Sequence, residues 1–268
     1  MRARAVQMDA AYAALGRTSA DFWDRRARRF HLATRDRVLD DPFYRRARRF
    51  VGRRTSVLDV GAGTGRFSLA LAPLAAEVTA VEPNASMVGY LKADAAAAGL
   101  SNLDAVQARW EDTSGLRADV ALCSHVLYPI EDGAGFLRRL DSAAQKVCLV
   151  YMRARHVDEL SSPIWEEFHA QPRALPPTYI DAVNLLHELG ILANVEMAQV
   201  RSSWSYDDLP SAVDEYLDQL IIRDTPDNRA RLARLLRDWL VELPDGRLGL
   251  PVPVLPTAII WWTKRRTM

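Results

Sequence analysis

The stretch VLDVGAGTG (residues 57–65) joins a run of apolar residues to three closely spaced glycines. The apolar run is typical of a buried β-strand, and apolar residues continue at helical spacing after Gly65. Glycines at a strand-to-helix turn let a ligand approach the backbone closely. The stretch therefore predicts a ligand-binding turn at the carboxyl end of a strand.

The glycine spacing narrows the class of ligand. A dinucleotide site favours G-x-G-x-x-G, whereas position 66 is Arg, so the third glycine comes one residue early. The stretch also lacks the Gly-Lys-Ser/Thr ending of a phosphate-binding loop. A ligand without phosphates that carries an amino acid and a nucleoside fits better. Asp59 adds a negative charge at the strand end, which suits a cationic amino group.

Acidic residues follow the next two predicted strands. Glu82 comes seventeen residues after Gly65 and can accept both hydroxyl protons of a ribose. Pro83 and Met87 are placed to flank a purine. After the third strand, a carboxylate and a backbone N–H could form hydrogen bonds with the amino edge of an adenine. The residues at this position are Trp110, Glu111 and Asp112.

Strands and helices alternate through the first half of the chain, which predicts a parallel sheet with helices on both faces. The predicted strands are residues 55–62, 77–83, 103–109, 119–127, 146–152, 194–203 and 257–264. Apolar stripes within 213–221 and 232–240 predict two helices between the last two strands. We therefore expect an N-terminal basic helical arm (1–54), a core (55–204 and 257–268) and a mostly helical cap insertion (205–256).

At this point the sequence resembles the class I S-adenosylmethionine-dependent methyltransferases. The resemblance rests on VLDVGAGTGRFSLAL (57–71), VTAVEP (78–83), ARWED (108–112) and ADVALCSHVLYPIED (118–132). It implies a Rossmann-like, doubly wound α/β sheet of seven strands, mostly parallel, with one antiparallel strand at or near the end of the chain. It also implies S-adenosylmethionine as cofactor and S-adenosylhomocysteine as product.

The resemblance assigns roles residue by residue. Asp59 would hold the amino group of the cofactor, directly or through water, and Glu82 would bind its ribose hydroxyls. Glu111 or Asp112, with Trp110, would border the adenine, since Arg109 stands where many relatives carry Asp. The remaining positions expected to line the cofactor are Gly61, Ala62, Gly63, Gly65, Pro83, Met87 and Ser124.

Catalytic groups are less clearly marked. The catalytic candidates are His125, at the end of the fourth strand, and Tyr128, just after it. His156, His169 and Tyr206 are further options for a general base. No metal-ligand cluster is visible in the sequence. Aromatic and histidine side chains expected to line an acceptor pocket under the cap are Tyr12, Trp23, His156, Trp165, His169, Tyr179 and Tyr206.

Positive charge is concentrated in the N-terminal arm. Residues 1–54 contain fifteen Arg, no Lys and six Asp, in a chain whose net charge is +1. RRARRF occurs at 25–30 and again at 45–50, each copy within an amphipathic helical pattern. Asp41 and Pro42 resemble an N-cap and first helical residue. The arm could attract a nucleic acid or an anionic partner, or dock on its own chain.

Composition completes the expectations. Hydrophobic residues make up 49% and charged residues 26%, as in ordinary globular proteins. Two cysteines and no long apolar segment favour a cytoplasmic protein that does not span a membrane. A small-molecule methyl acceptor is preferred, because no Asn-Pro-Pro-Tyr-like signature follows the fourth strand, which weakens the case for a DNA or RNA base amine as acceptor. An RNA acceptor and a non-catalytic cofactor-binding module are the alternatives, and a homodimer is a further option.

Overall fold

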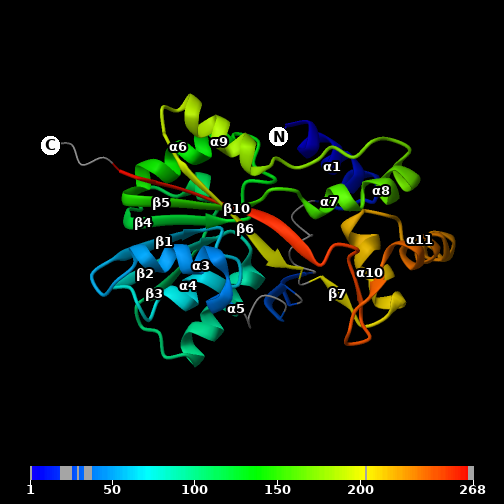
Figure 1. Cartoon of the computed structure of the whole chain (residues 1–268), viewed down its shortest axis with the longest axis horizontal. Coiled ribbons are helices and arrows are strands. Elements are labelled where there is room, and N and C mark those ends of the chain that lie inside the picture. Colours follow the sequence, from blue (N-terminus) through cyan, green and yellow to red (C-terminus); the bar gives the residue numbers. More distant parts are fainter. Residues whose placement is uncertain (1, 19–25, 29, 33–37, 203, 265–268) are drawn as a thin grey trace.

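A mixed β-sheet of seven strands forms the centre of the structure, which is a computed structural model (Figure 1). Its strands run in the order β3-β2-β1-β4-β5-β10-β6. The residues that the structure describes are 2–18, 26–28, 30–32, 38–202 and 204–264.

The sheet has the predicted doubly wound topology. β1, β2, β3, β4 and β5 pair in parallel, and β10 is antiparallel to both of its neighbours, β5 and β6. This confirms the expected seven-stranded sheet with one antiparallel strand late in the chain. The strands are β1 (Ser56–Val60), β2 (Glu77–Glu82), β3 (Leu103–Gln107), β4 (Ala118–Ser124), β5 (Ala144–Arg153), β6 (Asn194–Arg201) and β10 (Val254–Thr263).

Helices cover both faces of the sheet because the central strands are apolar on both sides. Along β5, Leu149 and Tyr151 pack with α3 and α4, whereas Val150 and Met152 pack with α6 and α9. This alternation follows from the two-residue period of a strand. The flanking helices are α3 (Pro42–Ala47), α4 (Arg66–Leu71), α5 (Ala85–Ala97), α6 (Gly133–Ala143) and α9 (Tyr179–Glu188). Short 3-10 turns are η1 (Val38–Asp40), η2 (Arg48–Phe50) and η3 (Trp110–Asp112).

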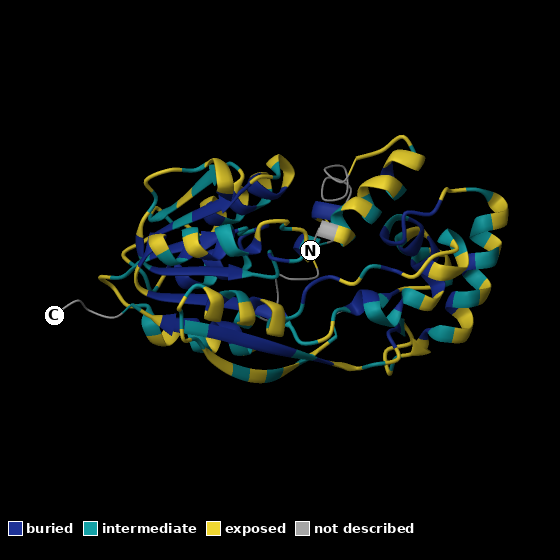
Figure 2. Ribbon diagram, turned by 90° about the horizontal axis from the view of Figure 1, so that it is seen from above, coloured by how far each residue is buried: buried dark blue, intermediate teal, exposed yellow. Residues whose placement is uncertain are grey.

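A second hydrophobic cluster lies beside the carboxyl ends of the strands (Figure 2). We call the chain between β6 and β10 the cap. Its helices pack with the N-terminal helix and with the segment after β5, so the cluster includes Tyr12, Trp165 and Tyr216. The elements involved are α1 (Arg2–Ala14), α7 (Val157–Leu160), α8 (Ser162–His169), β7 (Ser205–Tyr206), α10 (Leu209–Gln219), α11 (Pro226–Trp239), β8 (Val241–Glu242) and β9 (Leu248–Gly249).

The expected N-terminal arm divides between the two clusters. Asp41 caps α3 by accepting a hydrogen bond from the Phe43 N–H, as the Asp-Pro pattern predicted. Phe43 packs between α4 and one face of the sheet, whereas Tyr12 packs in the cap cluster. The described parts of residues 1–54 therefore contact two different hydrophobic cores. Trp23 lies outside the described residues, and the division into domains stays a prediction.

In the parts of the chain that the structure describes, every helix is too short or too polar to cross a membrane.

Candidate functional site

The glycine turn between β1 and α4 has the left-handed backbone that its sequence predicts. The φ angles of Gly61, Gly63 and Gly65 are 71°, 57° and 87°. A Cβ atom on Gly61 would lie 2.4 Å from a methyl of Val126, so this position cannot hold a side chain without movement. The N–H groups of Gly61 and Ala62 donate to the Val81 carbonyl, at 2.8 and 3.0 Å. These bonds hold the turn against the end of β2.

Glu82 fixes the middle of the same turn. Its Oε2 accepts a hydrogen bond from the Gly63 N–H and its Oε1 accepts one from the Asn84 N–H, both at 2.9 Å. Burial raises the pKa of Glu82, although these two backbone N–H groups partly oppose the rise. Each carboxylate oxygen has a second lone pair, so the side chain can still accept two hydroxyl protons from a ligand.

Asp59 lies on β1 beneath the turn. It is buried, and its Oδ2 accepts a hydrogen bond from the Ser68 hydroxyl at 2.6 Å. Burial raises the pKa of Asp59 to about 7; the Ser68 hydroxyl opposes this, and the negative charge of Glu82 adds to it. A cation bound nearby would favour the ionised form. Ser68 was not anticipated from the sequence, where it reads as an ordinary helix residue.

The other residues expected around a purine differ in exposure. Met87 is buried, whereas Pro83 is exposed. Glu111 and Asp112 are exposed after the end of β3, where Glu111 lies 3.7 Å from Arg109. The ring of Trp110 instead packs against Phe136 in the core, with the Arg139 guanidinium over its face. The choice between Glu111 and Asp112 stays open.

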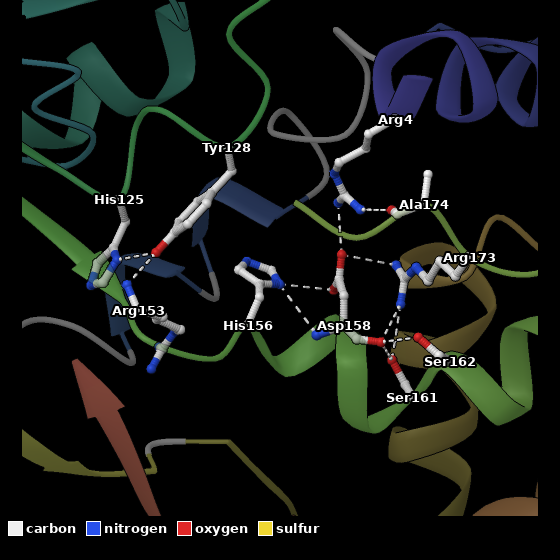
Figure 3. A network of polar contacts seen from close by, with 10 residues as sticks. All are labelled: Arg4, His125, Tyr128, Arg153, His156, Asp158, Ser161, Ser162, Arg173 and Ala174. Atoms are coloured by element: carbon white, nitrogen blue, oxygen red, sulfur yellow. Dashed lines mark hydrogen bonds and ion pairs between the residues drawn. The ribbon is translucent and has the colours of Figure 1, made fainter. Parts of the chain in front are cut away.

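His125 and Tyr128 come together just after Ser124, the last residue of β4 (Figure 3). His125 has a φ of 60°, and its N–H donates to the Tyr151 carbonyl at 2.9 Å. This left-handed residue turns the chain so that the Tyr128 Oη lies 2.9 Å from His125 Nδ1. The same Oη accepts a hydrogen bond from the Arg153 backbone N–H at 2.8 Å.

These contacts define the protonation of both side chains. Burial lowers the pKa of His125 well below its usual value, and the charges of Arg153 and Arg66 lower it further. Burial also raises the pKa of Tyr128 to about 12, so this side chain keeps its proton at neutral pH. Because Tyr128 Oη already accepts the Arg153 N–H, its own proton is best donated to His125 Nδ1. On the basis of this hydrogen-bond pattern we assign His125 as a neutral imidazole whose proton is on Nε2.

Two arginines near this pair were missed in the sequence. Arg153 ends β5, and its guanidinium forms no hydrogen bond or ion pair with any described residue. Arg66 begins α4; one nitrogen donates to Asp41 at 2.8 Å, while its buried Nε has no partner among the described residues. The period of the β5 sequence places Arg153 on the Tyr151 face, but only the strand order brings it near His125.

A buried ionic cluster joins α7 to α1 and to the segment that follows α8 (Figure 3). Asp158 accepts from Arg4 at 2.7 Å and lies 3.2 Å from an Arg173 nitrogen. Burial by itself would raise the pKa of Asp158, but Arg173, His156 and Arg4 hold it well below its usual range. His156 caps α7 by accepting the Asp158 N–H, and its ring meets that of Tyr128 edge-on, with 4.6 Å between ring centroids.

Most of the aromatic residues that we expected to line an acceptor pocket lie in hydrophobic clusters. Tyr12, Trp165 and Tyr206 are buried within the cap cluster, because they fill its own core. His169 stacks on Trp165 and contacts the Leu220 carbonyl, and Tyr179 packs against the core formed with α6. Of that set, His156 is the described residue that reaches Tyr128.

Comparison with known proteins identifies the domain that carries this turn. Residues 57–159 match the family described as "Methyltransferase domain". This part of the chain is therefore similar to methyltransferase domains, in agreement with the resemblance in the sequence, which implies S-adenosylmethionine as cofactor.

Individual relatives add the following. A protein of Haemophilus influenzae described as an uncharacterized protein is 30% identical over 172 residues, which span 62% of this chain and 63% of that protein. A protein of Bacillus halodurans C-125 has a similar fold, with a TM-score of 0.57 and 15% identity over 84% of this chain and 97% of that one. Coclaurine N-methyltransferase, solved with N-methylheliamine and S-adenosylhomocysteine, gives a TM-score of 0.52 and 15% identity over 83% of this chain and 70% of that one.

The residues present fit S-adenosylmethionine. Gly63 has no side chain at a position that Phe30 and Met87 border closely, since a Cβ there would lie 3.4 Å from the Phe30 ring and 3.8 Å from the Met87 sulfur. Glu82 offers lone pairs to a ribose, and Asp59 supplies a carboxylate beneath the turn. No group of three or more metal-ligating side chains occurs within the described ranges.

Proposed function

We propose that this protein transfers the methyl group of S-adenosylmethionine to a small-molecule acceptor by in-line displacement. When bound, the cofactor supplies an activated methyl group, and the acceptor nucleophile bonds to its carbon while the C–S bond breaks and sulfur keeps the electron pair. The protein's contribution is to hold the acceptor opposite the departing sulfur. Gly61, Ala62, Gly63, Gly65, Glu82 and Asp59 would bind the cofactor, together with Pro83, Met87, Trp110, Glu111 or Asp112, and Ser124.

The observation that carries the proposal is the fixed His125–Tyr128 pair at the end of β4. In an open α/β sheet, ligands bind beyond the carboxyl ends of the strands, and β4 lies next to β1 and its glycine turn. His125 is neutral there and presents Nε2–H, so it is suited to donate a hydrogen bond that orients the acceptor. Tyr128 holds the ring in this tautomer by its hydroxyl.

The alternative, a nucleic-acid methyltransferase, is supported less well by the contacts of the basic arm. At least five arginines of residues 1–54 pair with carboxylates of the same chain: Arg4 with Asp158, Arg17 with Asp218, Arg26 with Glu215 and Asp218, Arg45 with Asp40, and Arg46 with Glu196. Arginines that are paired with carboxylates of their own chain contribute less to the binding of nucleic-acid phosphates. A salt titration of RNA binding tests this directly, since phosphate contacts would give a steep dependence on salt concentration.

The role of His125 is tested by replacing it with Ala and measuring methyl transfer and cofactor affinity separately. A lost orienting hydrogen bond should lower the turnover rate by about ten- to a hundredfold, because the methyl-transfer geometry is no longer fixed. Affinity for S-adenosylhomocysteine should stay unchanged. His187→Ala on the exposed side of α9 is the matched control. Equal turnover of the two variants would contradict the assigned role.

A further inference from the structure

The region around His125 holds more positive than negative charge. Four guanidinium groups approach the carboxyl ends of β4 and β5 and the segment that follows: Arg4, Arg66, Arg153 and Arg173. The carboxylates paired with them are Asp41 and Asp158. Asp158 forms ion pairs with Arg4 and Arg173, and Asp41 forms one with Arg66. This leaves Arg153 without a carboxylate partner among the described residues.

A guanidinium without an ion-pair partner in such a place is costly. Arg153 is half-buried, and desolvation lowers the pKa of its guanidinium. Tyr128, Tyr151 and Asp41 oppose this shift through their charges, whereas Arg66 adds to it. Buried charges in proteins are normally paired, because the loss of hydration must be offset by a partner. A neighbouring arginine, Arg155, shows the usual arrangement: it is exposed and pairs with Glu159 at 2.7 Å. The missing partner of Arg153 points to a ligand.

The position of Arg153 relates it to the acceptor rather than to the cofactor turn. Arg153 ends β5, which is separated from β1 by β4. Neighbouring strands are about 4.8 Å apart, so the backbone of β5 lies about 10 Å from that of β1 and its glycines. Arg66, in contrast, immediately follows Gly65. In Figure 3 the Arg153 guanidinium lies on the His125 side of the network, apart from the Arg4–Asp158–Arg173 cluster.

We propose that Arg153 binds an oxyanion group, a carboxylate or phosphate, of the methyl acceptor, so that this enzyme methylates small organic acids. The inference rests on the proposed methyl-transfer function and names the substrate class. A guanidinium presents parallel N–H donors that match the two oxygens of a carboxylate or phosphate. The Nε2–H of His125 gives a second, neutral donor beside it. Together they would anchor an acid at the end of β4 and β5.

The first arm of the test asks which compounds act as acceptors. A metabolite extract is separated by anion exchange into retained and unretained fractions before incubation with the protein and methyl-labelled S-adenosylmethionine. We expect labelled product from the retained, acidic fraction. Labelled product from the unretained fraction alone would overturn the inference and leave the proposed function standing. No transfer from either fraction would overturn the proposed function, and the inference with it.

The second arm uses variants with the active fraction. Arg153→Gln should lower kcat/KM by about ten- to a hundredfold through the loss of charge-assisted hydrogen bonds, and Arg153→Lys should recover part of it. Arg155→Gln, two residues along, should behave like the unaltered protein. Equal kcat/KM values for Arg153→Gln and Arg155→Gln would overturn the inference.

The third arm separates the acceptor from the other carboxylate in the reaction, that of the cofactor. Calorimetry compares S-adenosylhomocysteine with 5′-methylthioadenosine, which lacks the amino-acid portion. We expect Arg153→Gln to bind both as the unaltered protein does, which also shows that the variant is folded. Weaker binding of S-adenosylhomocysteine alone would assign Arg153 to the cofactor carboxylate and overturn the inference.

Discussion

The Glu82 carboxylate and the Gly63 backbone N–H are joined by a hydrogen bond of 2.9 Å, which links the end of β2 to the middle of the glycine turn. Nineteen residues separate the two in sequence, and the parallel pairing of β1 with β2 brings them together. The side chain that we assign to the ribose therefore also shapes the turn that would hold the methionine portion of the cofactor. Replacement of Glu82 is expected to affect both.

Replacing Glu82 by Gln tests the ribose assignment. The amide keeps one acceptor oxygen but loses the charge, and a charge-assisted hydrogen bond contributes about 1.5–3 kcal/mol. Affinity for S-adenosylhomocysteine should therefore fall about ten- to a hundredfold in calorimetry. Glu77→Gln, at the exposed start of the same strand, is the control. An unaltered dissociation constant for Glu82→Gln would place the ribose elsewhere.

Replacing Gly63 by Val tests the position of the cofactor on the turn. The Cβ of the new side chain would already contact Phe30 and Met87, so its methyl groups would crowd the turn on which we expect the cofactor to bind. Gly99→Val is a matched control, because Gly99 also has a positive φ, of 65°, but a Cβ added there would meet no atom within 4 Å. Both variants should lose stability from backbone strain, of about 1–2 kcal/mol or more. We expect only Gly63→Val to lose S-adenosylhomocysteine binding. If Gly63→Val still binds it, the cofactor does not lie against Gly63.

The pH dependence of cofactor affinity should report Asp59. Its pKa is raised to about 7 in the folded protein, so the carboxylate that would attract the cofactor's amino group forms only as pH rises through 7. Affinity for S-adenosylhomocysteine should increase about tenfold between pH 6 and pH 8, because the ionised fraction of this carboxylate rises by that factor. Calorimetry across this range measures the effect, and Asp59→Asn should flatten it. A flat profile for the unaltered protein would remove Asp59 from cofactor binding.

The Asp158 cluster should stabilise the contact between α7, α1 and the segment that follows α8. The folded pKa of Asp158 is depressed, so its contribution is present above the unfolded value of about 3.9 and is lost as pH falls below it. Asp158→Asn leaves Arg173 buried without a counter-charge and should cost about 3–5 kcal/mol at pH 7. Urea unfolding at pH 7 and pH 3 measures this. A difference between the two proteins that does not shrink at pH 3 would contradict the ionic origin.

Much of the fold was predictable because the local signals agree with one another. The glycine turn after residues 57–60 and the alternation of strands with helices indicated the doubly wound sheet, and Asp41 with Pro42 marked the start of α3. These features depend on neighbours in sequence. The spacing of Glu82 after Gly65 was informative for the same reason, since it spans one strand-helix-strand unit.

The remainder depends on contacts that no local pattern records. Tyr12 and Trp165 carry the same apolar signal whether they line a ligand site or fill a core, and the structure places both in the cap cluster. The sequence does not reveal that the Arg153 guanidinium is unpaired among the described residues, because its surroundings are set by the position of β5 beside β4. The His125–Tyr128 pair depends on a positive φ at a residue other than glycine, which sequence does not reveal.

The central claim is tested most directly by incubating the protein with methyl-labelled S-adenosylmethionine and a metabolite extract cleared of macromolecules, and measuring S-adenosylhomocysteine and labelled product together. The account predicts that S-adenosylhomocysteine and a labelled small molecule form in equal amounts, and that both disappear with Gly63→Val. If S-adenosylhomocysteine does not exceed the level found without extract, and label is transferred only when RNA is added, the account is contradicted.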